Sequence, residues 1–139
     1  MTAAGARRAR LLRLRTIEHR VATARLVEAD TAHAAVIGIS ERITMLRNST
    51  IAAEGSYSGR DLQNAAELAD RLDHARIGLD KALADSLHLR MVRDADRIVA
   101  HVRQERTHRV HSAALTREDA ERELRAASAQ PPRLKKRND

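Results

Sequence analysis

Apolar residues recur at alternating steps of three and four along most of this chain, which is the spacing of one face of an α-helix. The stripe in the first half consists of Leu14, Ile17, Val21 and Ala24, followed by Ala32, Val36, Ile39, Ile43 and Leu46. Between the two parts the spacing runs in fours through Glu28, a stutter that locally unwinds a supercoil. This pattern predicts one long helix over residues about 7–53.

A second stripe follows after residue 60. It consists of Leu62, Ala65, Ala69, Leu72, Arg76, Leu79 and Leu83, continued by Leu87, Met91, Ala95, Ile98, Val102 and Glu105. Beyond Val110 the stripe thins, and Pro131-Pro132 stop any helix. We therefore predict a second helix over about 61–128. Its last part should fray after about Val110 in solution and order on a partner, with an overhang of several turns as the alternative.

The segment between the two stripes reads Gly55-Ser56-Tyr57-Ser58-Gly59, a cluster that predicts a turn over 54–60. Ser58 or Asp61 can cap the helix that follows. Neither helix can bury its narrow stripe alone, so the two should fold back on each other. The expected fold class is all-α, a long two-helix antiparallel coiled-coil hairpin over residues 1–130. We expect 131–139 to be a disordered basic tail.

The composition supports an interaction protein more than an enzyme. Tyr57 is the single aromatic residue of 139, and there is no cysteine, so disulfides, thiolate metal sites and cysteine nucleophiles are excluded. Such a chain has little material for a ligand pocket and no stacking surface for bases. No apolar run is long enough to span a membrane, and we expect a cytoplasmic location, with the cytoplasmic face of the inner membrane as one place of action.

Positive charge is concentrated at the two ends of the chain. The net charge is +7, while residues 1–25 carry seven arginines against one glutamate and residues 131–139 carry four basic residues against one aspartate. A hairpin brings both ends together, so one end should be basic and attract an acidic partner. The residues expected to bind a partner are Arg7, Arg8, Arg10, Arg13, Arg15, Tyr57, Arg133, Lys135, Lys136 and Arg137.

Candidate catalytic and metal-binding residues do not form a site. His101, His108 and His111 share a helix face, but the surrounding arginines would repel a cation. The carboxylates stand beside arginines at helical spacing, as Glu118 does with Arg122, which is typical of solvated ion pairs. We therefore expect no enzymatic activity, no metal, no cofactor and no small-molecule substrate.

The outline of a basic two-helix coiled coil resembles the flagellar FliJ family of type III export, which includes the YscO-like injectisome proteins. The resemblance lies in the length, the hairpin, the opening Arg10-Leu11-Leu12-Arg13-Leu14-Arg15 and the charged tail. It implies a bacterial, non-enzymatic stalk that enters a hexameric export ATPase and contacts the export gate and export chaperones. The near absence of aromatic residues departs from many members, so no residue role is carried over.

Two other functions fit the same features. A nucleic-acid- or ribosome-associated coiled coil would use the basic end for phosphate contacts. A generic homodimeric scaffold would pack two hairpins into a four-helix bundle. Direct membrane binding is less favoured, because exposed Leu, Phe and Trp are not expected on these helices.

Overall fold

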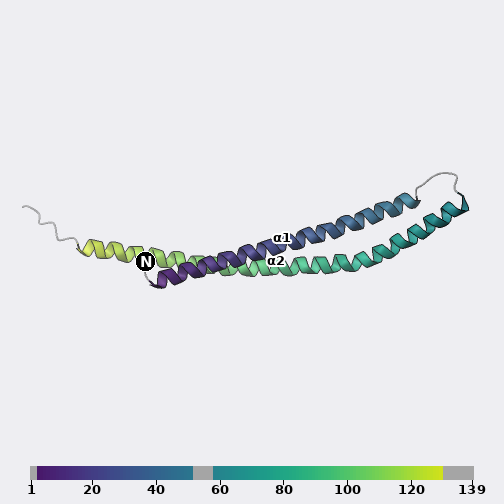
Figure 1. The fold of residues 1–139 in the computed structure, drawn as a ribbon. Helices are drawn as coiled ribbons and strands as arrows, with labels where there is room; N and C mark the ends of the chain where they lie inside the picture. The colour runs from purple at the N-terminus through teal and green to yellow at the C-terminus, as the bar shows by residue number, and fades with distance from the viewer. Residues whose placement is uncertain (1–2, 52–57, 130–139) are drawn as a thin grey trace, which may run out of the picture. The chain divides into compact units, whose positions relative to one another are not determined.

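The computed structural model describes residues 3–51 and 58–129, and these form two long helices. Helix α1 covers Ala3–Ile51 and helix α2 covers Gly59–Ala129 (Figure 1). The all-α prediction is confirmed, since the helices pack on each other and the described residues contain no strand. The predicted bounds, 7–53 and 61–128, differ from the observed ones by a few residues. Helix α1 starts earlier because Ala3, Ala4 and Ala6 favour helix. The predicted turn lies mostly, and the predicted tail entirely, outside the described residues.

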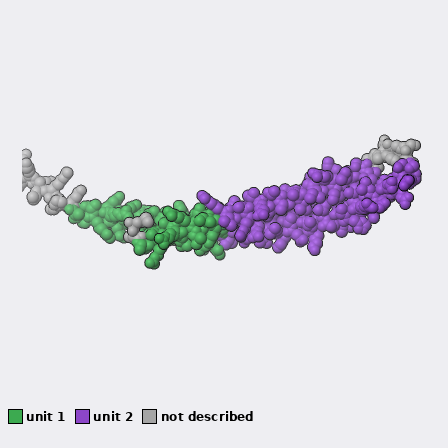
Figure 2. Space-filling model, in the orientation of Figure 1, with its two compact units in different colours: residues 1–19, 100–139 green, residues 20–99 purple. Residues whose placement is uncertain are grey.

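The chain divides into two units, each built from a part of both helices. Unit 1 comprises residues 1–19 and 100–139, and unit 2 comprises residues 20–99 (Figure 2). Within each unit the helices run antiparallel, as the paired residues show. In unit 1 Thr16 is joined to Gln104, and in unit 2 His33 is joined to Ser86. The paired residue numbers sum to 120 and 119 respectively, so both units keep nearly the same register.

The contact between the helices follows a strict seven-residue repeat. On α1 the covered positions include Leu12, His19, Leu26, His33, Ser40 and Arg47, each seven residues after the one before. On α2 they include Ala65, Leu72, Leu79, Ser86, Arg93, Ala100, Thr107 and Ala114. We call these two rows and the half-buried residues between them the seam. An unbroken seven-residue repeat is the periodicity of a left-handed supercoil.

The seam differs from the predicted stripes over much of the chain. Of the α2 positions predicted from Ala65 to Leu83, all but the exposed Arg76 belong to the seam. After Leu83 the seam continues through Ser86, and Leu87 is exposed. On α1 the predicted Leu14, Ile17 and Val21 are exposed, and only Val36 and Ile43 belong to the seam. The stutters inferred from the apolar residues therefore do not describe the packing, because the seam keeps a seven-residue repeat that includes polar residues.

Several positions along the seam hold polar residues, and these form contacts between the two helices. In unit 2 Arg47 Nε lies 3.2 Å from both carboxylate oxygens of Asp73, and Arg90 pairs with Asp30. His33 Nδ1 lies 2.8 Å from Ser86 Oγ. Ala29 is the one buried apolar side chain among the described residues. Partly exposed ion pairs contribute little to stability, so this seam specifies register more than it supplies binding energy.

The far end of α2 continues as a helix past the contact with α1. Glu118 is its last half-buried residue, and every position from Asp119 to Ala129 is exposed. Arg122 and Arg125 form ion pairs with Asp119 and Glu121 there, at 3.1 and 3.4 Å. Fraying after Val110 was the preferred expectation, and the structure instead shows the overhang.

The start of α2 is capped as the sequence predicted. The Asp61 amide donates to Ser58 Oγ at 3.3 Å, and the Ser58 amide donates to Asp61 Oδ2 at 3.1 Å. This reciprocal pair is a capping box. The hydrogen bonds from the Ser58 hydroxyl and amide lower the pKa of Asp61 below its ordinary value of 3.8.

Removing this cap should weaken the start of α2. Ser58→Ala is expected to cost about 1 kcal/mol of stability and to return the pKa of Asp61 toward 3.8. The pKa of Asp61 is lower in the folded chain than in the unfolded chain. The ionised carboxylate therefore stabilises the fold at pH values above the unfolded-state pKa, and this stabilisation is lost as the pH falls through the folded-state pKa. Thermal unfolding followed by circular dichroism, and a carboxyl NMR titration of Asp61, measure the two effects. Ser112→Ala, inside α2, is the control and should leave the Asp61 titration unchanged.

Candidate partner-binding surface

Unit 1 is strongly basic. Its described residues, 3–19 and 100–129, carry eleven arginines against six aspartates and glutamates, a net charge of +5. In unit 2 the described residues carry eleven basic and eleven acidic side chains, a net charge of zero. The charge asymmetry predicted from the sequence is thus a difference between the two units, and unit 1 is where an acidic partner would be attracted.

Three of the predicted arginines lie on the exposed side of α1 in unit 1. The structure gives Arg7, Arg10 and Arg13 no ion pair with any described residue, and all three are exposed. Arg7 and Arg10 continue in helical steps into Leu14 and Ile17, which are 50% and 57% exposed. This face, which we call the basic face, therefore combines unpaired guanidinium groups with apolar side chains. Exposed leucines were not expected from the sequence, and that expectation was wrong.

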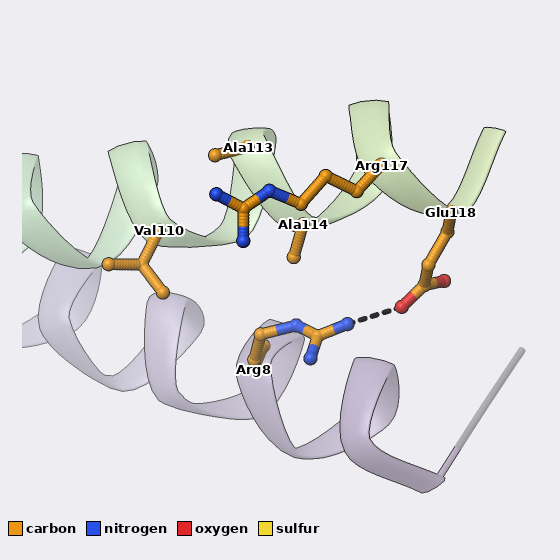
Figure 3. Close-up of a pocket in the computed structure, with 6 residues that line it drawn as sticks. All are labelled: Arg8, Val110, Ala113, Ala114, Arg117 and Glu118. Carbon is orange, nitrogen blue, oxygen red and sulfur yellow. Dashed lines mark hydrogen bonds and ion pairs between the residues drawn. The ribbon is translucent and has the colours of Figure 1, made fainter. Parts of the chain in front are cut away.

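Two other predicted arginines are engaged within the chain. Arg8 forms an ion pair with Glu118 of α2 beside a surface pocket lined by Val110, Ala113 and Ala114 (Figure 3). Its Nε is buried and has no hydrogen-bond partner in the structure. Arg15 Nη1 donates to Glu18 at 2.7 Å. Both side chains are half-buried and paired, Arg8 across the two helices and Arg15 within α1, so they offer less charge to a partner than Arg7, Arg10 and Arg13.

The remaining predicted partner-binding residues lie outside the described parts of the chain. They are Tyr57, Arg133, Lys135, Lys136 and Arg137.

Four histidines take part in the helix contact, namely His19, His33, His101 and His111, and no metal cluster forms within the described ranges. The rings of His19 and His101 lie 5.2 Å apart, centre to centre, and are tilted by 43°. His111 belongs to the seam with its Nδ1 buried and without a hydrogen-bond partner, whereas His108 is exposed. Sequence reasoning considered His101, His108 and His111 as one face and missed the pairing of His19 with His101. Counting sevens onward from Ala65 and Ala69 would have placed Gln104, His111 and Glu118 in the seam.

Unit 2 exposes an apolar row of its own on α2. Leu87, Met91 and Ile98 are 42%, 64% and 48% exposed, and Ala95 between them is exposed as well. Steps of four, four and three keep these side chains on one face of the helix. We call this row the outer stripe; it is the stripe that the sequence analysis had assigned to the helix contact.

Comparisons with known proteins give no relative. No protein-family model, no curated protein and no solved structure matches the chain. Within residues 3–51 and 58–129, neither helix is long and apolar enough to cross a membrane.

Proposed function

We propose that this chain is a non-enzymatic coiled-coil stalk or adaptor of the bacterial flagellar type III export apparatus. In this role it contacts the hexameric export ATPase ring and the export gate or chaperones. The observation that carries the proposal is the basic face, where Arg7, Arg10 and Arg13 are unpaired beside exposed Leu14 and Ile17. The resemblance of the basic hairpin to the FliJ family supplies the identity of the partner.

The basic face suits a protein partner with acidic side chains around an apolar patch. Charged groups at an interface steer the encounter and fix its orientation more than they add affinity. The apolar residues between the arginines supply area that keeps its binding energy when salt screens the charges. Two features support a stalk: two long antiparallel helices, and positive charge concentrated in unit 1.

Reversing the three unpaired arginines should abolish partner binding and leave the fold intact. In the variant Arg7→Glu, Arg10→Glu, Arg13→Glu no ion pair between described residues is lost, and the three side chains are exposed, so the helix contact is not disturbed. The matched control in unit 2 is Arg42→Glu, Arg60→Glu, Arg76→Glu. It also replaces three arginines by glutamates, and these three side chains are exposed and form no ion pair with any described residue. Binding should fall at least tenfold for the first variant and stay near wild type for the second.

The measurement is a tagged pull-down from the native cell at moderate salt, after nuclease treatment, read by mass spectrometry. Recovery of an export ATPase with gate or chaperone proteins, lost with the first variant only, is the expected result. Equal loss with both variants would show that net charge matters and the basic face does not. Recovery without an export component would contradict the proposed identity.

A nucleic-acid- or ribosome-associated role is the second candidate, favoured by the net charge of +5 on the described part of unit 1. Binding through phosphates would weaken steeply with salt, with a log–log slope of about −0.9 for each phosphate contacted on a duplex. Ribosomal or nucleoid proteins that disappear after nuclease treatment would favour this role over the stalk.

A further inference from the structure

Between residues 86 and 98 of α2, the large apolar side chains lie outside the helix pair. The seam positions of α2 that follow Leu83 are polar or charged, namely Ser86, Arg93, Asp94 and Arg97. Along the same stretch of α2, the face that α1 does not cover carries Leu87, Met91, Ala95 and Ile98. A helix is stabilised in water by burying its apolar side, so the outer stripe is a surface that packing within one chain does not satisfy.

We infer that a second copy of this chain covers the outer stripe, by an antiparallel contact between the two α2 helices. This inference is independent of the proposed function, which uses the basic face of unit 1. Contact between identical surfaces about a two-fold axis is the commonest way in which soluble proteins form dimers. The outer stripe meets the two requirements of such a contact, which are complementary shape and complementary charge.

Shape complementarity follows from the order of residues along the stripe. An antiparallel pair centred between Met91 and Ala95 sets Leu87 of one copy level with Ile98 of the other, and Met91 level with Ala95. Large side chains then meet at the two ends, and large meets small in the middle, so that the layers interdigitate. Spacing of three and four residues gives each side chain a gap on the facing helix.

Charge favours a second copy over an acidic or basic partner. From residue 77 to residue 98 there are four basic and four acidic side chains, and the described part of unit 2 is neutral. Two copies therefore meet without net repulsion, unlike two copies of the basic unit 1. Arg90 and Asp94, which lie beside the stripe, are paired with Asp30 and Arg97 within the chain, so their charges are already compensated. A parallel contact would instead set Met91 against Met91 and Leu87 against Leu87.

Cysteine cross-linking tests both the contact and its direction, because the natural chain has no cysteine. Leu87→Cys and Ile98→Cys are each exposed substitutions and should not disturb the seam. Under mild oxidation a mixture of the two variants should form a covalent dimer. Each variant alone should not, since in the antiparallel contact two copies of residue 87 are separated by eleven residues, roughly 16 Å along the axis. Ala66→Cys mixed with Ile98→Cys is the control and should form no covalent dimer, because the exposed Ala66 lies 21 residues before Leu87 along α2.

The uncrosslinked chain provides a second measurement. Sedimentation equilibrium of the wild type should show a concentration-dependent dimer, and Met91→Glu should shift the dissociation constant upward at least tenfold. The same substitution should leave the helical circular dichroism signal and the partner pull-down unchanged, whereas the arginine reversals in unit 1 should leave the dimer unchanged. A monomer at all concentrations would overturn the inference, and efficient cross-linking of either cysteine variant with itself would overturn the antiparallel arrangement.

Discussion

Lysine in place of Ala29 should lower the free energy of unfolding by about 2–3 kcal/mol, the largest loss expected from one substitution in unit 2. Ala29 is 5% exposed, and the surface pocket beside it is lined by Arg25, Glu28, Leu89 and Arg93 among others. The new side chain overfills the space between the helices and adds a third cation beside Arg25 and Arg93, where Glu28 is the one carboxylate of the lining. Loss of the circular dichroism signal on heating, compared with wild type, measures the effect.

Two matched variants separate the contributions of size and charge at this position. Ala29→Glu adds a side chain of similar length with the opposite charge, so it should lose less stability than Ala29→Lys. Ala35→Lys places the same cation on an exposed position of α1 and should change stability by no more than about 0.5 kcal/mol. Equal losses for Ala29→Lys and Ala29→Glu would show that packing alone determines the cost and that the neighbouring arginines have no part in it.

Alanine at both Gly38 and Gly78 should stabilise the chain by about 2 kcal/mol. Each glycine lies inside a helix, and a Cβ atom built on either one meets nothing within 4 Å. Neither has a positive φ angle, so the substitution introduces no backbone strain. Alanine gains about 1 kcal/mol over glycine in a helix interior, and changes without shared contacts are additive.

Urea unfolding of the two single variants and the double variant measures this gain. Gly59→Ala is the control, since Gly59 is the first residue of α2, where the preference for alanine is weaker. No gain at Gly38 or Gly78 would contradict the simple helix-propensity argument and would indicate that the backbone at these positions needs the freedom of glycine.

The two proposed surfaces are separate, so they can be tested in the same set of proteins. The basic face lies on α1 in unit 1, and the outer stripe lies on α2 in unit 2. A stalk that also dimerises through the outer stripe would present two basic faces to its partners. Each surface has a variant that removes it and leaves the other, so the two proposals succeed or fail independently.

Much of the fold follows from local features of the sequence. The long runs without proline, the cluster from Gly55 to Gly59 and Pro131-Pro132 predicted two helices and their approximate ends. Ser58 and Asp61 formed the expected cap because capping depends on neighbours within one turn. Five seam positions from Ala65 to Leu83 were predicted, because apolar residues recur there at helical spacing, and the sixth predicted position, Arg76, is exposed.

The candidate surface was predicted only in part. The sequence placed the positive charge at one end, but it could not separate the exposed Arg7, Arg10 and Arg13 from Arg8 and Arg15. For Arg8 the separation depends on Glu118, which is 110 positions away and meets it only through the packing of α2 on α1. Arg15 pairs with Glu18 on its own helix, a local contact that the sequence analysis did not consider. The outer stripe was recognised as apolar and assigned to the wrong face, because an apolar row by itself does not show which helix covers it.

The sequence by itself therefore determined that the chain is two helices, where they end and which regions are basic, because helix propensity, capping and charge are local properties. Only the tertiary structure decided which side of each helix faces the other. Both helices carry two candidate rows, one apolar with stutters and one mixed row repeating strictly every seven residues. The mixed row becomes the seam because two helices stay in contact over many turns only where their contacting rows have the same period. Small side chains and ion pairs such as Arg47–Asp73 fit between the two helices along this row.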